Sequence, residues 1–133
     1  MARKGKFATV FSAKAANGWG VEVDVDPYRH VLVQIATASN ASGLLKCWGS
    51  GSATRPTWAN AASVANINAP KRMIDLDDGS SVTGSTGLDP ATTDIVKEFK
   101  VNTDNIRTLN FELSGFAAGT FTVKVRPIND TRN

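Results

Sequence analysis

The side chains that most often perform acid–base, nucleophilic or metal chemistry are scarce in this chain of 133 residues. It has one histidine, His30, and one cysteine, Cys47. His30 lies at the entrance of a predicted strand, and no Gly-x-Ser-x-Gly elbow accompanies it. A lone cysteine can form neither an internal disulfide nor a cysteine-rich zinc site, and the apolar run around Cys47 predicts burial. We therefore expect no enzymatic activity, no catalytic residue and no cofactor.

Three aspartates before a glycine superficially resemble a calcium-binding loop. They are Asp75, Asp77 and Asp78, followed by Gly79. A helix-flanked calcium loop places acidic residues at its first, third and fifth positions and a glycine at its sixth. Here the glycine takes the fifth position, so the spacing does not fit. Because Asp-Gly marks tight hairpin turns, the segment predicts a solvated turn and no metal site.

The tryptophans are the remaining binding candidates, because an indole can stack on a sugar ring or anchor a protein interface. Trp19 and Trp48 lie in or beside predicted strands, which favours the core. Trp58 follows Arg55-Pro56 and opens a segment, Trp58–Ala69, that could be a long loop or one short helix. Trp58 is therefore a candidate interface residue, with a sugar, another subunit or the edge of the core as its open alternatives.

Charge is distributed unevenly along the chain. The formal net charge is +3, and the first 14 residues contain Arg3, Lys4, Lys6 and Lys14 but no acidic residue. The rest of the chain is close to neutral, so the sequence predicts a basic N-terminal arm on a near-neutral body. Arg3, Lys4 and Lys6 are candidate interface residues for an acidic surface. Nucleic-acid binding is not expected, since no basic helix or aromatic RNA-binding motif is present.

An alternation of apolar and polar residues dominates the chain, and no stretch of a dozen residues has a helical apolar period. Residues 1–14 are predicted to form the basic arm and a first strand, and residues 15–133 one β-sandwich domain. The connection at Gly115–Gly119 predicts a hairpin between the last two strands. About seven to nine short strands predict an all-β fold, a single antiparallel sandwich of jelly-roll type. The clearest strand patterns are Trp19–Val25, Val31–Ile35, Leu44–Trp48, Ile74–Leu76, Ile95–Val101, Leu109–Leu113 and Phe121–Val125.

The order of features in the C-terminal half resembles a known group of proteins. The strand Ile95–Val101 is followed by the Arg-containing strand Asn105–Gly115, which ends in Ser-Gly, and Gly-Thr opens Gly119–Val125. Together with the upstream strand Tyr28–Ile35, this order is similar to that of β-sandwich proteins of tailed-bacteriophage virions. Those proteins are capsid decorations and fibre or tail-associated parts. The resemblance implies a non-enzymatic, self-associating structural role.

The function expected from these observations is that of a virion structural protein. A capsid decoration, or cement, protein that docks through subunit interfaces and its basic arm is the first choice. A tail or fibre-associated component is one alternative, and a carbohydrate-binding or adhesion module is another. The expected partners are further copies of the chain, for example in a trimer, other virion proteins and in the last case a glycan. The expected location is the virion after assembly in the host cytoplasm, without a membrane partner, because no apolar run could span a bilayer.

Overall fold

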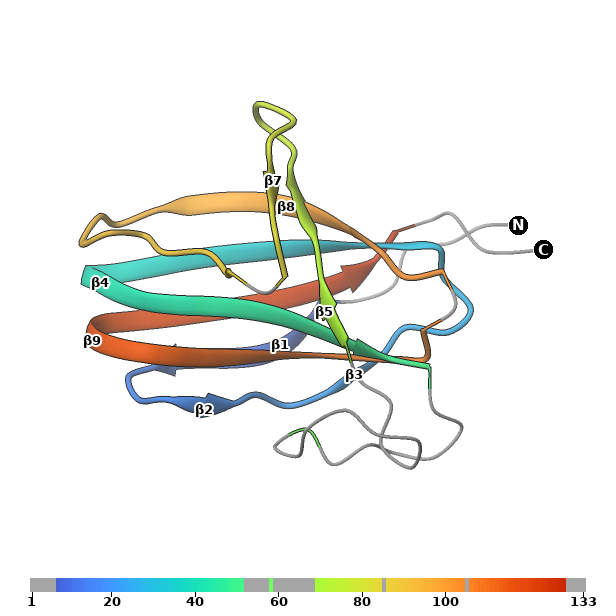
Figure 1. Ribbon diagram of the computed structural model, residues 1–133, viewed down its shortest axis with the longest axis horizontal. Coiled ribbons are helices and arrows are strands. Elements are labelled where there is room, and N and C mark those ends of the chain that lie inside the picture. The colour runs from blue at the N-terminus through green and yellow to red at the C-terminus, as the bar shows by residue number, and fades with distance from the viewer. Residues whose placement is uncertain (1–6, 52–57, 59–68, 85, 105, 129–133) are drawn as a thin grey trace.

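The computed structural model describes residues 7–51, 58, 69–84, 86–104 and 106–128. These residues form β-strands joined by turns and contain no helix, so the expected all-β class is confirmed (Figure 1). In this described part of the chain, no helix is long and apolar enough to cross a membrane. The strands are β1 (Ala8–Lys14), β2 (Gly18–Trp19), β3 (Val23–Asp24), β4 (His30–Ser50), β5 (Ala69–Lys71), β6 (Met73–Asp75), β7 (Ser81–Val82), β8 (Val96–Asn102) and β9 (Thr108–Pro127).

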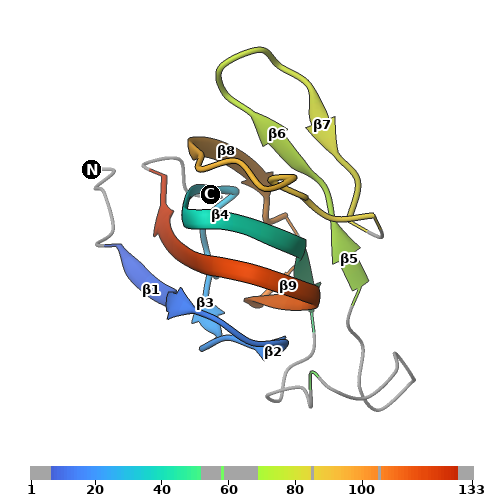
Figure 2. The same ribbon diagram turned by 90° about the vertical axis from the view of Figure 1, so that its left-hand side faces the viewer.

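Two long strands form the frame of the molecule. Strand β4 has 21 residues and β9 has 20, and the two pair antiparallel from Val31 opposite Pro127 to Ser50 opposite Thr108. Both strands fold over near their middle, at the same end of the molecule (Figures 1 and 2). Each strand therefore contributes one half to each of two layers, and the layers are joined without a separate connecting loop.

The shorter strands extend these two layers. In the first layer, β1 pairs with the second half of β9, β8 with the first half of β4, and β6 with β8. In the second layer, β2 and β3 pair with the first half of β9, and β5 pairs with the second half of β4. The result is an antiparallel sandwich-like domain in which one continuous sheet is folded onto itself.

The bends in β4 and β9 coincide with unusual backbone geometry in both strands. The pairing register shifts between Ala38 and Ser42, and Ser39 and Asn40 between them have φ angles of 61° and 56°. Opposite them in β9, Gly119 has a φ of 77°, a conformation that glycine adopts without strain. A Cβ at Gly119 would lie 2.5 Å from the Ala38 carbonyl oxygen, so no larger residue fits without a shift of the backbone.

The expected hairpin between the last two strands is wrong. Leu109 and Leu113 pair with Gly49 and Leu45, whereas Phe121 pairs with Thr37 in the other layer. The Gly115–Gly119 connection is therefore a bend inside β9. Strand β4 bends at the same place as β9. Both halves of β9 therefore pair with β4, and the ladder between the two strands continues on each side of the bend.

Alternating apolar residues of both layers meet in one core. In β4 these are Val31, Val33 and Ile35 of the first half and Leu45 and Cys47 of the second, and none of them is exposed. The buried hydrophobic residues of β9 follow the same alternation, as the period-two pattern predicts for a strand with one buried face. They are Leu109, Phe111, Leu113, Phe121, Val123 and Val125.

Candidate functional site

The predicted interface residues fall into two groups. Arg3, Lys4 and Lys6 lie outside the residues that the structure describes. Trp58 is described, and its side chain is only 8% exposed. The structure therefore places one of the four within the chain's own packing, and the intermolecular role of all four stays a prediction.

The three tryptophans form one cluster on the second layer. The ring of Trp19 lies 5.6 Å from that of Trp48 and 5.9 Å from that of Trp58, both measured between ring centroids. The indole N–H of Trp58 donates a hydrogen bond of 3.1 Å to Oε1 of Glu22. Tilted aromatic pairs of this kind are attractive beyond the area that they bury. The cluster holds Trp58 against strand β2 and leaves little of its indole for a sugar or a subunit.

Cys47 and His30 were the candidates for nucleophilic and acid–base chemistry, and both lie in strand β4. Cys47 faces the core and is fully buried, and this burial raises the pKa of its thiol far above the usual range. It therefore stays a neutral thiol. His30 is the first residue of β4, where it pairs with Asn102, and its carbonyl accepts a hydrogen bond from the N–H of Ile128.

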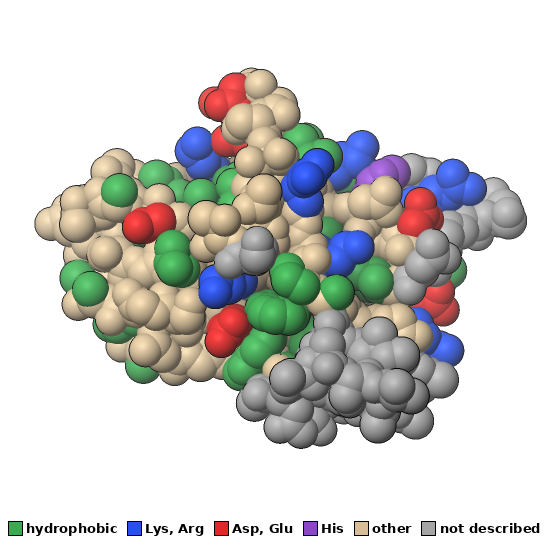
Figure 3. All heavy atoms as spheres, viewed as in Figure 1, with side chains coloured by type: hydrophobic (Ala, Val, Ile, Leu, Met, Phe, Trp, Pro, Cys, Tyr) green, Lys and Arg blue, Asp and Glu red, His purple; other side chains and the backbone are tan. Residues whose placement is uncertain are grey.

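The aspartate segment is the hairpin turn that its sequence predicts. Strands β6 and β7 pair across it, and the N–H of Gly79 donates to the carbonyl of Asp75. The hairpin projects from the first layer, and acidic side chains gather at its tip (Figure 3). The described residues contain no group of three or more His, Cys, Asp or Glu side chains that could hold a metal ion.

Asp75 stabilises the turn of this hairpin and links it to β8. Its Oδ1 accepts the N–H of Asp77 at 2.8 Å, and its Oδ2 lies 3.0 Å from Nζ of Lys97 on β8. The backbone hydrogen bond and then the Lys97 ammonium lower the pKa of the Asp75 carboxyl. The same pair raises the pKa of Lys97. Both groups are therefore charged at neutral pH, and the charge of Lys97 is balanced within the chain.

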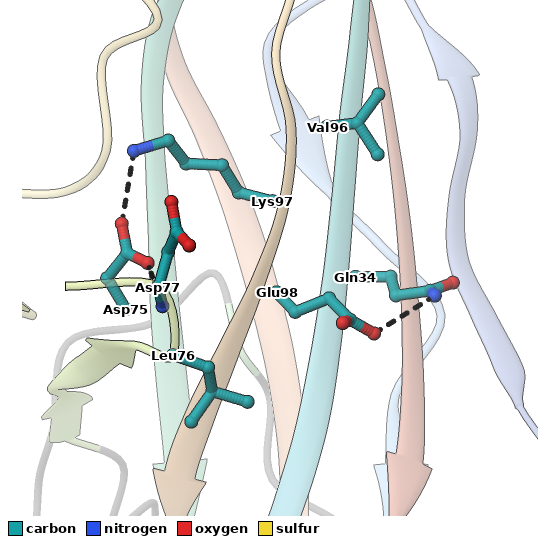
Figure 4. A pocket seen from close by; sticks show the side chains of 7 residues that line it. All are labelled: Gln34, Asp75, Leu76, Asp77, Val96, Lys97 and Glu98. Carbon is teal, nitrogen blue, oxygen red and sulfur yellow. Dashed lines mark hydrogen bonds and ion pairs between the residues drawn. The ribbon is translucent and has the colours of Figure 1, made fainter. Parts of the chain in front are cut away.

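A groove lies between the hairpin and strands β8 and β4 (Figure 4). Its volume is about 440 Å³, within the range of pockets that bind ligands or peptide side chains. A smaller hollow of about 160 Å³ shares Gln34 and Val96 with it and continues toward β9, where it meets Lys124. The groove itself is lined by Gln34, Asp75, Leu76, Asp77, Val96, Lys97 and Glu98.

Apolar side chains are unusually exposed around this groove. Val96 is 87% exposed and Leu76 is 49% exposed, although both belong to large hydrophobic residue types. Ile74, on the same hairpin, is 39% exposed. Exposed apolar side chains next to a rim of charged groups are typical of surfaces that bind another molecule. The groove is therefore the best binding candidate among the described residues.

The groove is anionic as well as partly apolar. It contains three carboxylates and one ammonium, and the ammonium of Lys97 is paired with Asp75. Glu98 accepts a hydrogen bond of 3.2 Å from the amide of Gln34. Such a surface attracts a ligand that combines cationic groups with apolar ones.

Sequence reasoning missed the groove, although one signal for it was present. Ile95 and Val96 are consecutive apolar residues at the start of a strand, so one of them must face away from the core. The pairing with Thr37 determines which of the two residues is buried. The N–H of Thr37 donates to the carbonyl of Ile95, and the Ile95 side chain packs on the core. Val96 is thereby turned to the surface.

These features define the class of the protein: an antiparallel β-sandwich whose layers share two folded strands and whose surface carries an anionic groove. No protein-family model and no curated protein sequence matches the chain. Its fold is shared by solved structures, among them the following two.

The first is the crystal structure of the SPBc2 prophage-derived protein YomS. The superposition has a TM-score of 0.69 at 14% sequence identity and covers 96% of this chain and 94% of that one. The second is the PBSX exported protein XepA, with a TM-score of 0.67 and 17% identity. That match covers 94% of this chain but 37% of XepA, so this chain corresponds to one part of the larger protein.

Proposed function

We propose that this chain is a non-catalytic structural protein of a bacteriophage particle. The observation that carries the proposal is the match to YomS, a prophage-derived protein, over nearly the full length of both chains. A second prophage protein, XepA, contains the same fold within a longer chain. Two phage-derived proteins with this architecture favour a phage origin for the present chain as well.

The surface chemistry supports binding as the mode of action. The thiol of Cys47 is buried and neutral, and the carboxylates of Asp75 and Asp78 are used in the hairpin turn and in the pair with Lys97. The groove, by contrast, presents exposed apolar side chains beside carboxylates. An outer surface of this kind would serve to hold a neighbouring protein.

Within this class, we propose a capsid decoration protein that docks on the capsid lattice through subunit interfaces and its basic arm. A small single domain with a basic extension suits attachment to the outside of a preformed shell. Stable docking needs more than about 1,000 Å² of buried surface, which one groove does not supply. Contacts between copies of the chain and with other virion proteins would supply the rest, after assembly in the host cytoplasm.

Fractionation of particles tests this proposal. Complete particles, tailless capsids and free tails are separated on a density gradient, and peptide mass spectrometry counts the chain in each fraction. A decoration protein is expected in tailless capsids, in proportion to the major capsid protein. A signal in free tails alone would replace the decoration role with a tail role, and a signal in no fraction would overturn the structural role.

A further inference from the structure

We propose that the groove between the β6–β7 hairpin and strands β8 and β4 binds the basic N-terminal segment of a second copy of this chain. This inference specifies the self-association in the proposed function and rests on it in that respect. The segment in question is residues 1–7, with the sequence Met-Ala-Arg-Lys-Gly-Lys-Phe.

The charges of the groove and of this segment are complementary. The groove has three carboxylates, and its single ammonium, Lys97, is already paired with Asp75. The segment has three cationic side chains, Arg3, Lys4 and Lys6, and no acidic one. Opposite charges on two surfaces speed their encounter and select the correct partner.

The apolar groups of the two surfaces are complementary as well. The groove exposes Val96 and Leu76, and binding would remove both from water. The segment contributes the aliphatic parts of its lysines, which can lie along an apolar surface while their ammonium groups reach carboxylates. It also contains Phe7, whose ring is 38% exposed. A ligand with cationic and apolar groups in alternation fits both features of the groove.

The geometry of the first layer favours a second copy over the same chain as the source of the segment. Strands β1 and β6 lie on opposite sides of β9, β4 and β8, and Figure 2 shows them far apart. The groove begins at Gln34 on β4, two strand spacings or roughly 10 Å from β1, and ends at the hairpin, four spacings or roughly 19 Å away. Six extended residues reach at most about 20 Å. An arm that crossed the sheet to the carboxylates of its own groove, on β8 and the hairpin, would use most of this reach in crossing, and little of it would remain to lie in the groove.

The direction of the chain strengthens this argument. Ala8 pairs with Val125, and the Phe7 ring lies 5.0 Å from the guanidinium of Arg126, so the chain before Ala8 leads away from the bend in β9. Val96 pairs with Ala36, and this pair lies nearer to the bend than the row of Ala8 and Val125. The segment therefore starts out away from the Val96 end of its own groove.

A contact between the arm of one copy and the groove of the next is heterologous. Such contacts close into a ring when the rotation between neighbours fits, and otherwise continue as an open chain. Both the arm and the groove of every copy are then used. A self-association of this type needs one arm and one groove per copy, which this chain provides.

A peptide-binding experiment on the full-length chain tests the proposal. The receptor is the chain with Arg3→Glu, Lys4→Glu and Lys6→Glu, so that its own arm cannot compete. The probe is a fluorescently labelled peptide of residues 1–8, followed by anisotropy at low and high salt. We expect saturable binding that weakens with salt. Adding Asp77→Lys and Glu98→Lys to the receptor should weaken it at least tenfold, as should Val96→Gln.

A matched control separates the groove from net charge. Asp24→Lys with Glu112→Lys changes the net charge equally but lies on the second layer, where β3 and β2 pair with β9. This pair should leave peptide binding within about twofold of the starting receptor. Equal losses from the groove pair and the control pair would overturn the proposal, as would a peptide that does not bind.

Charge reversal provides a second readout in the self-association of the chain. The arm-reversed chain and the groove-reversed chain should each associate less than the natural sequence, and the chain with both reversals should recover. Failure to recover would overturn the arm–groove contact. Particle fractionation is independent of this result. If the chain lacks the arm–groove contact but is found in capsids, only the present inference is overturned. If the peptide binds but the chain is found in no particle fraction, the proposed function is overturned.

Discussion

Trp58 stabilises the chain through contacts that can be tested one at a time. Replacing it with Ala removes the ring contact with Trp19 and the hydrogen bond to Glu22, so the free energy of unfolding should fall by about 3 kcal/mol. Trp58→Phe keeps an aromatic ring but loses the hydrogen bond and part of the packing of the larger indole, which should cost about 1–2 kcal/mol. Urea unfolding of the three proteins measures both changes. An Ala variant as stable as the natural protein would mean that Trp58 is available to a partner after all.

The Asp75–Lys97 pair makes stability depend on pH in a defined direction. The pKa of Asp75 is lowered in the folded state by the Asp77 N–H and by Lys97, from an ordinary value of about 3.9. The resulting stabilisation is fully present above that ordinary pKa and is lost as the pH falls through the lower, folded pKa. We therefore expect the natural protein to exceed Asp75→Asn in stability at neutral pH, and this advantage to vanish in strong acid.

The alkaline side of the profile has the opposite sign. The pKa of Lys97 is raised in the folded state by Asp75, so its contribution persists through the ordinary lysine value of about 10.4. It is lost only as the pH rises through the folded pKa. Thermal unfolding of both proteins across the pH range checks both ends. A constant difference between them at every pH would show that the carboxylate does not act through its charge.

Residues that obey local rules could be predicted, and those that depend on distant partners could not. The Asp78-Gly79 turn follows from two adjacent residues, and Gly79 has the positive φ of 77° that such turns favour. The exposure of Val96 depends instead on which residue of β4 pairs with Ile95. That pairing joins residues 58 positions apart, and periodicity within one strand cannot determine it.

At the scale of the elements, the bend in β4 and β9 determines the layering, and two glycines test it. Gly119→Ala places a Cβ against Ala38 and Ala41 at a φ of 77°, and should lower the free energy of unfolding by about 2–3 kcal/mol. Gly115→Ala meets nothing within 4 Å and has a similar φ of 59°, so it should cost only about 1 kcal/mol. Denaturant unfolding of the two variants compares steric and conformational costs directly. Equal losses would mean that the close approach at Gly119 is not tight.

The apolar alternation was enough to predict most strand segments but not their continuity. The patterns at Leu109–Leu113 and Phe121–Val125 are both strands, and both pair with β4. Gly115 and Gly119 between them have the residue type of a hairpin turn, and the same chemistry serves a bend in one strand. The difference is decided by Ser39 and Asn40 in β4, which bend the partner strand at the same place. Local turn signals cannot reveal that two distant segments bend together.

For the whole molecule, the expected self-association can be measured as a solution mass. Light scattering on a sizing column compares the protein with its 14.1 kDa monomer at physiological and at high salt. We expect a closed oligomer at physiological salt that dissociates as salt screens the arm, and less association when residues 2–6 are deleted. A monomer at all concentrations in both conditions would contradict self-association in solution.

The first and the last strand of the described chain, β1 and β9, are neighbours in the first layer. Ala8 lies opposite Val125, and β1 and β9 run antiparallel, so the start of β1 and the end of β9 lie side by side. A pulling force applied to both ends would load this ladder in the unzipping direction and open its hydrogen bonds one after another. Opposite forces directed along β4 and along β9 would load the ladder between these strands in shear, where many hydrogen bonds resist together. In the proposed role on a capsid, attachment through the faces of the protein and not through its ends would therefore resist deformation best.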